Sequence, residues 1–382
     1  MATTHVFIVD SITFKYHLEY MFAGTGAKDN VIDFNNVQSS NLHSTTENNL
    51  LGMIADSQRV RIGDFVIFYL QQNFQRGIRE GKFYGVFRVR EAPSFLDNND
   101  SQQFLKQQLG KSLTFRTIIE PYQVYADGVT EWEALDEIRN IQSPNQMLWS
   151  LIYRKLKGNR GNTMITIYES ERLINLIRSK NIRTVLNGNS FTFNETTQQI
   201  ETQQPANQYS GRKETINILP RLVNKYCNGK QFETHLQAYI LQNIENLPMF
   251  TNQPIEWIGN EVSCGVGMQR IDIMLSLNTQ NRKILPIELK SVVAYPEITI
   301  QLQRYIDWIE QYYLPNRPSD IEPMIIARQI TDKTTQDYQD LILAFNNFNN
   351  QNNNLRLRYI EFNIDCNNKT ITFNEINYDG FN

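Results

Sequence analysis

The chain has 382 residues, of which 41% are hydrophobic and 20% are charged, and its formal net charge at pH 7 is −3. This length predicts two domains, and the composition is typical of globular proteins rather than fibrous or disordered ones. The sequence has no apolar run of membrane-spanning length, and its first residues, MATTHVFIVD, lack the pattern of a secretory signal. We therefore expect a cytoplasmic protein without membrane contacts.

The cysteines and histidines carry no recognisable metal or redox pattern. Cys227, Cys264 and Cys366 are too widely spaced for a disulfide framework or a CxxC motif. The histidines also lack zinc-ligand spacing: His5, His17, His43 and His235. We expect ordinary packing roles for these side chains and a reducing compartment.

The first half of the sequence consists mainly of predicted strands. VFIVD at 6–10 predicts an apolar strand, and RIGDFVIFYL at 61–70 predicts a turn followed by a buried strand. GKFYGVFRVRE at 81–91 is its expected partner strand. YESERLINLIRSK at 168–180 has apolar residues at helical spacing. Residues 1–185 are therefore expected to form a mixed α+β domain of the β-barrel type.

Positive charge is concentrated between residues 151 and 190. Eight Lys or Arg residues against Glu169 and Glu171 give this stretch a local balance of +6. A basic stripe of this kind suits phosphate contacts, and a solvated helix face is the alternative interpretation. The stretch that follows, 186–212, is rich in Asn, Gln and Thr, which predicts a polar linker.

The second half alternates predicted helices and strands. The apolar patterns indicate helices at 231–245, 297–313 and 336–346. Between and after them, strands are expected at 255–264, 270–277, 284–291, 323–328 and 356–364. The tract NNFNNQNNN at 346–354 is expected to be a loop. This order predicts an α/β domain with a mixed central sheet over residues 213–382.

Two strands of this domain carry acidic residues within apolar runs, in RIDIMLSLNTQNRKILPIELK at 270–290. If a loop is centred near residue 280, residues whose numbers sum to about 560 face each other, which pairs Asp272 with Glu288. Alternation along the strand then places Lys290 on the same face. Paired carboxylates repel unless a cation neutralises them, and Mg²⁺ is bound by one or two carboxylates. The set is typical of phosphodiester hydrolysis, with a salt-bridged surface pair as the alternative.

These residues belong to a longer ordered pattern that resembles the PD-(D/E)XK nuclease superfamily, in the branch that contains the NucS/EndoMS endonucleases. The resemblance covers roughly residues 230–330. Its elements are Glu233, the RID that ends at Asp272, the IELK that ends at Lys290, and QLQRY at 301–305. Ile271 stands where the name of the superfamily has proline, a common departure.

The resemblance implies a role for each matched residue. Asp272, Glu288 and the carbonyl of Leu289 would bind Mg²⁺, for which Mn²⁺ can substitute. Glu233 would support the metal through water. Lys290 would position the nucleophile, and Gln301 would orient the lysine or the water.

Four segments of the first half carry a second resemblance: RIGDFVIFYLQ, GKFYGVFRVREAPSFLDN, LWSLIYRKLKGN and TMITIYESERLINLI. By these segments, about residues 4–180 are similar to the EVE/YTH/PUA-like family. Such domains hold a flipped, often modified, base in an aromatic pocket. The candidate pocket residues are Phe22, Tyr69, Trp132 and Trp149, with core packing as the alternative for each. The expected phosphate contacts are Arg154, Lys155, Lys157, Arg160 and Arg304.

Both resemblances together imply an Mg²⁺-dependent DNA endonuclease of restriction type. The first domain would read a modified or flipped base, and the second would cleave the DNA. The alternatives are a sequence-specific type II restriction enzyme, a NucS-like mismatch endonuclease, and a non-catalytic DNA-binding protein with a decayed nuclease fold. The expected partner is DNA, and a homodimer would supply the two active sites that double-strand cleavage usually needs.

Overall fold

The computed structural model describes residues 2–26, 44–154, 162–264 and 269–378. The described chain divides into two compact units, one that ends at Ile216 and one that begins at Asn217. None of its helices is both long enough and apolar enough to cross a membrane.

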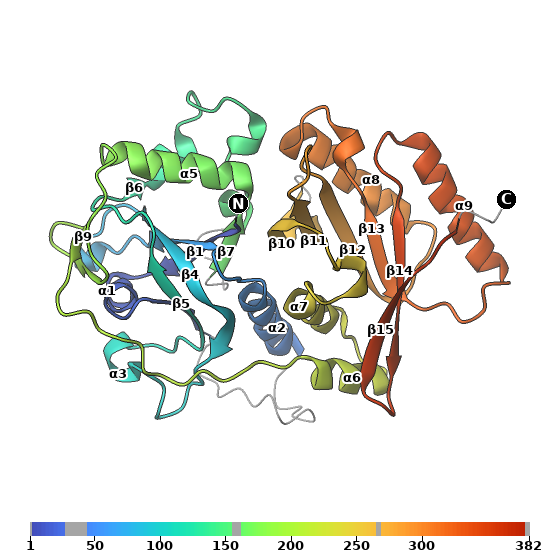
Figure 1. Cartoon of the computed structure of the whole chain (residues 1–382), viewed down its shortest axis with the longest axis horizontal. Coiled ribbons are helices and arrows are strands. Elements are labelled where there is room, and N and C mark those ends of the chain that lie inside the picture. The colour runs from blue at the N-terminus through green and yellow to red at the C-terminus, as the bar shows by residue number, and fades with distance from the viewer. Residues whose placement is uncertain (1, 27–43, 155–161, 265–268, 379–382) are drawn as a thin grey trace. The chain divides into compact units, whose positions relative to one another are not determined.

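Unit 1 is built on one curled sheet, with the strand order β2-β5-β4-β3-β1-β7 and β6 paired with β4 (Figure 1). Strands β1 and β3 are parallel, and β3 and β4 are antiparallel. The predicted pairing of β3 with β4 is therefore confirmed. The register of β4 shifts at several points, and such bulges bend a strand. In the described residues the sheet ends at β2 and β7, so it forms half of a barrel rather than a closed one. The strands are β1 (Thr4–Val9), β2 (Phe22–Thr25), β3 (Phe65–Leu70), β4 (Lys82–Leu96), β5 (Phe115–Pro121), β6 (Val129–Thr130) and β7 (Asn162–Ile165).

Helices pack against this sheet, and two of them begin at capping residues. Asp10 caps α1, and Thr166 and Glu169 form a capping box at the start of α5. The buried face of α5 includes Leu173 and Ile177. The helices are α1 (Ser11–Tyr20), α2 (Ser44–Gln58), α3 (Lys106–Leu109), α4 (Trp149–Arg154) and α5 (Ile167–Lys180), with short 3₁₀ or π turns at Phe74–Arg76, Trp132–Asp136 and Pro144–Gln146.

The polar linker expected at 186–212 is not what the structure shows. An antiparallel hairpin lies here, formed by β8 (Phe191–Asn194) and β9 (Gln199–Thr202). Its Phe191, Phe193 and Ile200 side chains are buried in the core of unit 1, where the Phe193 ring lies 4.9 Å from that of Phe14. The prediction failed because average composition hides the apolar–polar alternation of FTFN, which is a strand pattern.

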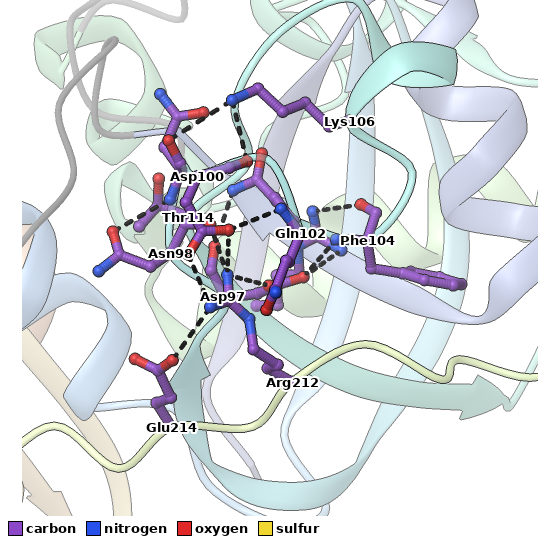
Figure 2. Close-up of polar contacts among 12 residues, drawn as sticks. Asp97, Asn98, Asp100, Gln102, Phe104, Lys106, Thr114, Arg212 and Glu214 are labelled. Carbon is purple, nitrogen blue, oxygen red and sulfur yellow. Dashed lines mark hydrogen bonds and ion pairs between the residues drawn. The ribbon is translucent and has the colours of Figure 1, made fainter.

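The rest of this stretch is held by a network of charged side chains, of which Arg116 and Asp97 are buried (Figure 2). The Arg116 guanidinium lies 3.1 Å from Asp97, and both side chains are fully buried. The Tyr209 hydroxyl donates to Asp97 over 3.1 Å, and Arg212 lies 2.7 Å from Asp100. A buried charge needs such partners, so the network fixes the chain to unit 1 well beyond the expected domain end at 185.

Phe193→Ala should lower the free energy of unfolding of unit 1 by about 3–5 kcal/mol, because it leaves a cavity in the core. Phe74→Ala is the matched control, since Phe74 is 72% exposed, and should change it by less than about 0.5 kcal/mol. Urea denaturation with hydrogen exchange on unit 1 measures both. Equal, small effects would restore the linker interpretation.

Unit 2 has a sheet with the strand order β10-β11-β12-β13-β14-β15. Strands β12, β13 and β14 are parallel and the other neighbours antiparallel, so the predicted mixed central sheet is confirmed. The strands are β10 (Ile255–Ser263), β11 (Arg270–Leu277), β12 (Ile284–Val293), β13 (Met324–Arg328), β14 (Arg358–Asp365) and β15 (Thr370–Glu375).

Helices cover both faces of this sheet (Figure 1). On one face, Phe232 before α7 contacts Phe362, and on the other, Phe345 of α9 contacts Tyr359. The sequence did not predict α6 or β15, and α9 continues through most of the asparagine-rich tract expected to be a loop. The helices are α6 (Leu219–Cys227), α7 (Glu233–Asn243), α8 (Ile298–Trp308) and α9 (Gln336–Gln351), with short 3₁₀ or π turns at Pro248–Phe250, Ile309–Tyr313 and Pro318–Asp320.

A disulfide joins Cys227 at the end of α6 to Cys366 in the turn after β14. Their Cα atoms are 5.9 Å apart, although 139 residues separate them in the sequence. The expectation that the cysteines have only packing roles is therefore wrong for these two and holds for Cys264, which is buried and free. Sequence spacing gives no information about a pair that only the fold brings together.

Candidate active site

Strands β11 and β12 bring the predicted acidic pair together. Ile273 lies opposite Ile287 and Ser276 opposite Ile284, so the predicted register, in which facing residue numbers sum to 560, is confirmed. Continuing this register by one residue places Asp272 opposite Glu288. Because the strands are antiparallel, the start of β11 and the end of β12 lie at the same edge of the sheet.

Asp272 is held by the backbone of the next strand. Its Oδ2 accepts a hydrogen bond of 2.8 Å from the Leu289 N–H, and its carbonyl oxygen accepts one of 2.8 Å from the Gln237 amide of α7. Within the described chain, its Oδ1 has no hydrogen-bond partner. Burial, followed by the negative charge of Glu288, raises the pKa of Asp272 well above its usual value.

Glu288 is 1% exposed, and both of its oxygens have partners. Oε1 accepts from the Lys290 ammonium, and Oε2 lies 2.7 Å from the Tyr305 hydroxyl. Burial raises the pKa of Glu288, and the Lys290 charge only partly offsets this effect. For Lys290, burial lowers the pKa, but Glu288, with smaller contributions from Glu233 and Tyr295, raises it to above its usual value, so the ammonium stays charged at neutral pH.

Glu233 and Gln301 reach this cluster from two helices, by contacts other than those the resemblance implies. Glu233 opens α7, and its Oε2 accepts from the Ser291 N–H over 3.1 Å. Gln301 of α8 donates to the Tyr305 hydroxyl over 2.6 Å, so it acts on Glu288 through Tyr305 rather than on Lys290. Sequence reasoning missed the role of Tyr305, although its spacing of four residues from Gln301 places both on one helix face.

The donor set suits a hard cation that keeps several of its water ligands. Within the described residues, no three His, Cys, Asp or Glu side chains are grouped to hold a metal ion by themselves. Asp272 and Glu288 provide two carboxylates. The residue after Glu288 is Leu289, whose backbone carbonyl is the further expected ligand. Two carboxylates with water are a usual protein contribution to Mg²⁺ binding, so these residues fit such an ion.

The four candidate base-pocket residues do not form one pocket. Phe22 and Tyr69 are fully buried in two different core clusters, so for both the core-packing alternative holds. Trp132 is 64% exposed, and Trp149 is half-buried at the start of α4. An aromatic side chain in a strand is as useful to a core as to a base, and the sequence does not distinguish the two uses.

The structure places only part of the expected phosphate-contact set. Arg304 is exposed on α8, the helix that carries Tyr305. Arg154 ends α4, and its side chain is not described. The remaining residues lie outside the described chain: Lys155, Lys157 and Arg160.

No protein-family model and no curated protein matches the chain. The site therefore has to be interpreted from its own geometry.

Tyr305→Phe should lower the free energy of unfolding of unit 2 by about 1–3 kcal/mol, because it removes a hydroxyl from a buried carboxylate. Tyr239→Phe is the control, since the Tyr239 ring packs on Phe373 and is only half-buried. Denaturant unfolding in EDTA compares the two variants. If both have the same small effect, the Tyr305 contact with Glu288 contributes nothing to stability.

Proposed function

We propose that the protein is a Mg²⁺-dependent DNA endonuclease of restriction type, with its active site at Asp272, Glu288 and Lys290. The observation that carries the proposal is the pair of facing carboxylates, buried at Glu288 and partly buried at Asp272. Their pKa values are raised by burial and, at Asp272, by the charge of Glu288. A fold keeps such repulsion where a bound cation offsets it. The ordered resemblance to PD-(D/E)XK nucleases gives the reaction class.

In this proposal, Asp272 and Glu288, with the Leu289 carbonyl, hold the metal ion, and Glu233 supports it through water. When bound, Mg²⁺ stabilises negative charge on a phosphoryl oxygen and lowers the pKa of a bound water. Lys290, which lies beside Glu288, would direct its ammonium to the attacking water or the scissile phosphate. Tyr305, which accepts a hydrogen bond from Gln301, holds Glu288 in place.

Unit 1 is proposed to select the DNA by reading a modified or flipped base. What supports this role is the resemblance of residues 4–180 to base-reading domains and the basic balance of residues 151–190. Phe22 and Tyr69 are no longer candidates for the pocket, because both are core residues. The predicted location is the cytoplasm, although the Cys227–Cys366 disulfide is of a type that reducing compartments disfavour.

Asp272→Asn and Lys290→Ala should each reduce DNA cleavage to background while DNA binding persists, because each removes a group that acts at the reacting phosphate. EDTA should have the same effect on the unaltered protein. Asp307→Asn is the matched control, since Asp307 is an exposed carboxylate on α8, and it should cut normally. Undiminished cleavage by either site variant would remove the assignment.

The substrate panel should contain methylated, hydroxymethylated, unmodified and mismatched duplexes. The proposal expects cleavage of modified DNA above all others. Cleavage of unmodified DNA at one sequence would favour a type II enzyme, and cleavage at mismatches a NucS-like one. Binding without Mg²⁺-stimulated nicking would identify a decayed nuclease.

A further inference from the structure

Unit 2 has a hollow of about 470 Å³ at the carboxyl ends of β12, β13 and β14, beside the start of α9. Open α/β sheets bind ligands at this edge, and the volume lies in the range of small-ligand sites. The hollow contains both aromatic and polar groups. The lining residues that matter here are Tyr226, Val293, Arg328, Asp337 and Asn363.

The hollow continues the proposed active site along the same sheet edge. Lys290 of β12 lies opposite Ala327 of β13, and Val293 lies opposite Arg328 after a bulge. Arg328 directly follows Ala327 on β13, about 3.3 Å further toward the carboxyl edge, and alternation places its side chain across that edge from Lys290. A DNA strand with its scissile phosphate at Lys290 that crosses this edge would reach the mouth of the hollow with its next nucleotide.

Arg328 is the lining group that indicates an anionic ligand. Its side chain is partly buried, and within the described residues it has no hydrogen bond or ion pair. Some other basic residues of unit 2 are paired, such as Lys333 with Glu361 and Arg358 with Glu375. A guanidinium left partly desolvated without a partner is suited to a phosphate, which it can bind through two parallel hydrogen bonds.

The other lining groups suit a base rather than a second phosphate. Tyr226 is a half-buried aromatic side chain, and Asn363 is an exposed amide with no side-chain partner in the described part of the chain. Asp337, in the first turn of α9, places negative charge at the same hollow. A carboxylate repels phosphate but accepts a hydrogen bond from the exocyclic amino group of adenine, cytosine or guanine.

We propose that this hollow binds the nucleotide next to the scissile phosphate, with its phosphate on Arg328 and its base between Tyr226 and Asn363. The inference rests on the proposed nuclease function and deepens it. It also assigns a preference, because Asp337 favours a base with an amino group over thymine. The site would thus contribute to the sequence context of cleavage from within the catalytic unit.

The test uses the full chain carrying Asp272→Asn, which removes cleavage, and a labelled duplex of the type that the unaltered protein cuts. Arg328→Gln should weaken binding about tenfold and reduce the salt slope by about one, since one phosphate contact is lost. The binding affinity of Arg328→Lys should fall between that of the protein with Arg328 and that of Arg328→Gln. Lys283→Gln is the control, because Lys283 lies just before the amino end of β12, and it should change neither quantity.

A second arm removes one base at a time from the strand near the cut. One abasic position should weaken binding of the Asp272→Asn protein about tenfold, and Asn363→Ala with Tyr226→Ala should abolish that sensitivity. If cleavage and DNA binding occur but Arg328→Gln and the abasic scan have no effect, the hollow is not a nucleotide site, and the nuclease proposal stands. If the binding of free dAMP or dCMP depends on Arg328 but the binding of the duplex does not, the hollow binds free nucleotides. That result would overturn the inference. A protein that neither binds nor cuts any duplex contradicts both proposals.

Discussion

Mutual repulsion between the buried carboxylate of Glu288 and the partly buried one of Asp272 is the constraint on which the proposed site depends. Asp272 and Glu288 cannot move apart, because the register of β11 and β12 is fixed by the buried Ile271, Ile273 and Ile287 on the other face. A slip of one residue would turn these apolar side chains to the wrong face. The core of unit 2 therefore holds the acidic pair in an arrangement that the pair itself disfavours.

The surroundings reduce this repulsion without removing it. The Leu289 N–H, the Lys290 ammonium and the Tyr305 hydroxyl each satisfy one carboxylate oxygen. Asp272 Oδ1 is left without a hydrogen bond in the described chain. Burial also raises the pKa of the neighbouring Cys264 thiol to about 12, with contributions from both carboxylates. An added cation is the natural partner for such a site.

Sequence reasoning succeeded where a local pattern decided the structure. A loop centred near residue 280 fixes which residues of two strands face each other, so the Asp272–Glu288 pair followed from counting. It failed where contacts between segments far apart in the sequence determine the structure. The burial of Phe193 depends on Phe14, and the Cys227–Cys366 bond depends on how α6 meets the turn after β14. Side-chain partners such as Tyr305 also depend on the packing of α8 against the sheet, which spacing alone does not supply.

Crystals soaked in Mn²⁺ test most directly whether Asp272 and Glu288 share one divalent ion. The account predicts an anomalous-scattering peak within about 2–2.5 Å of an oxygen of each carboxylate, and its loss in the Asp272→Asn protein. A peak bound to only one carboxylate, or Mn²⁺ sites found only elsewhere on the chain, would contradict it.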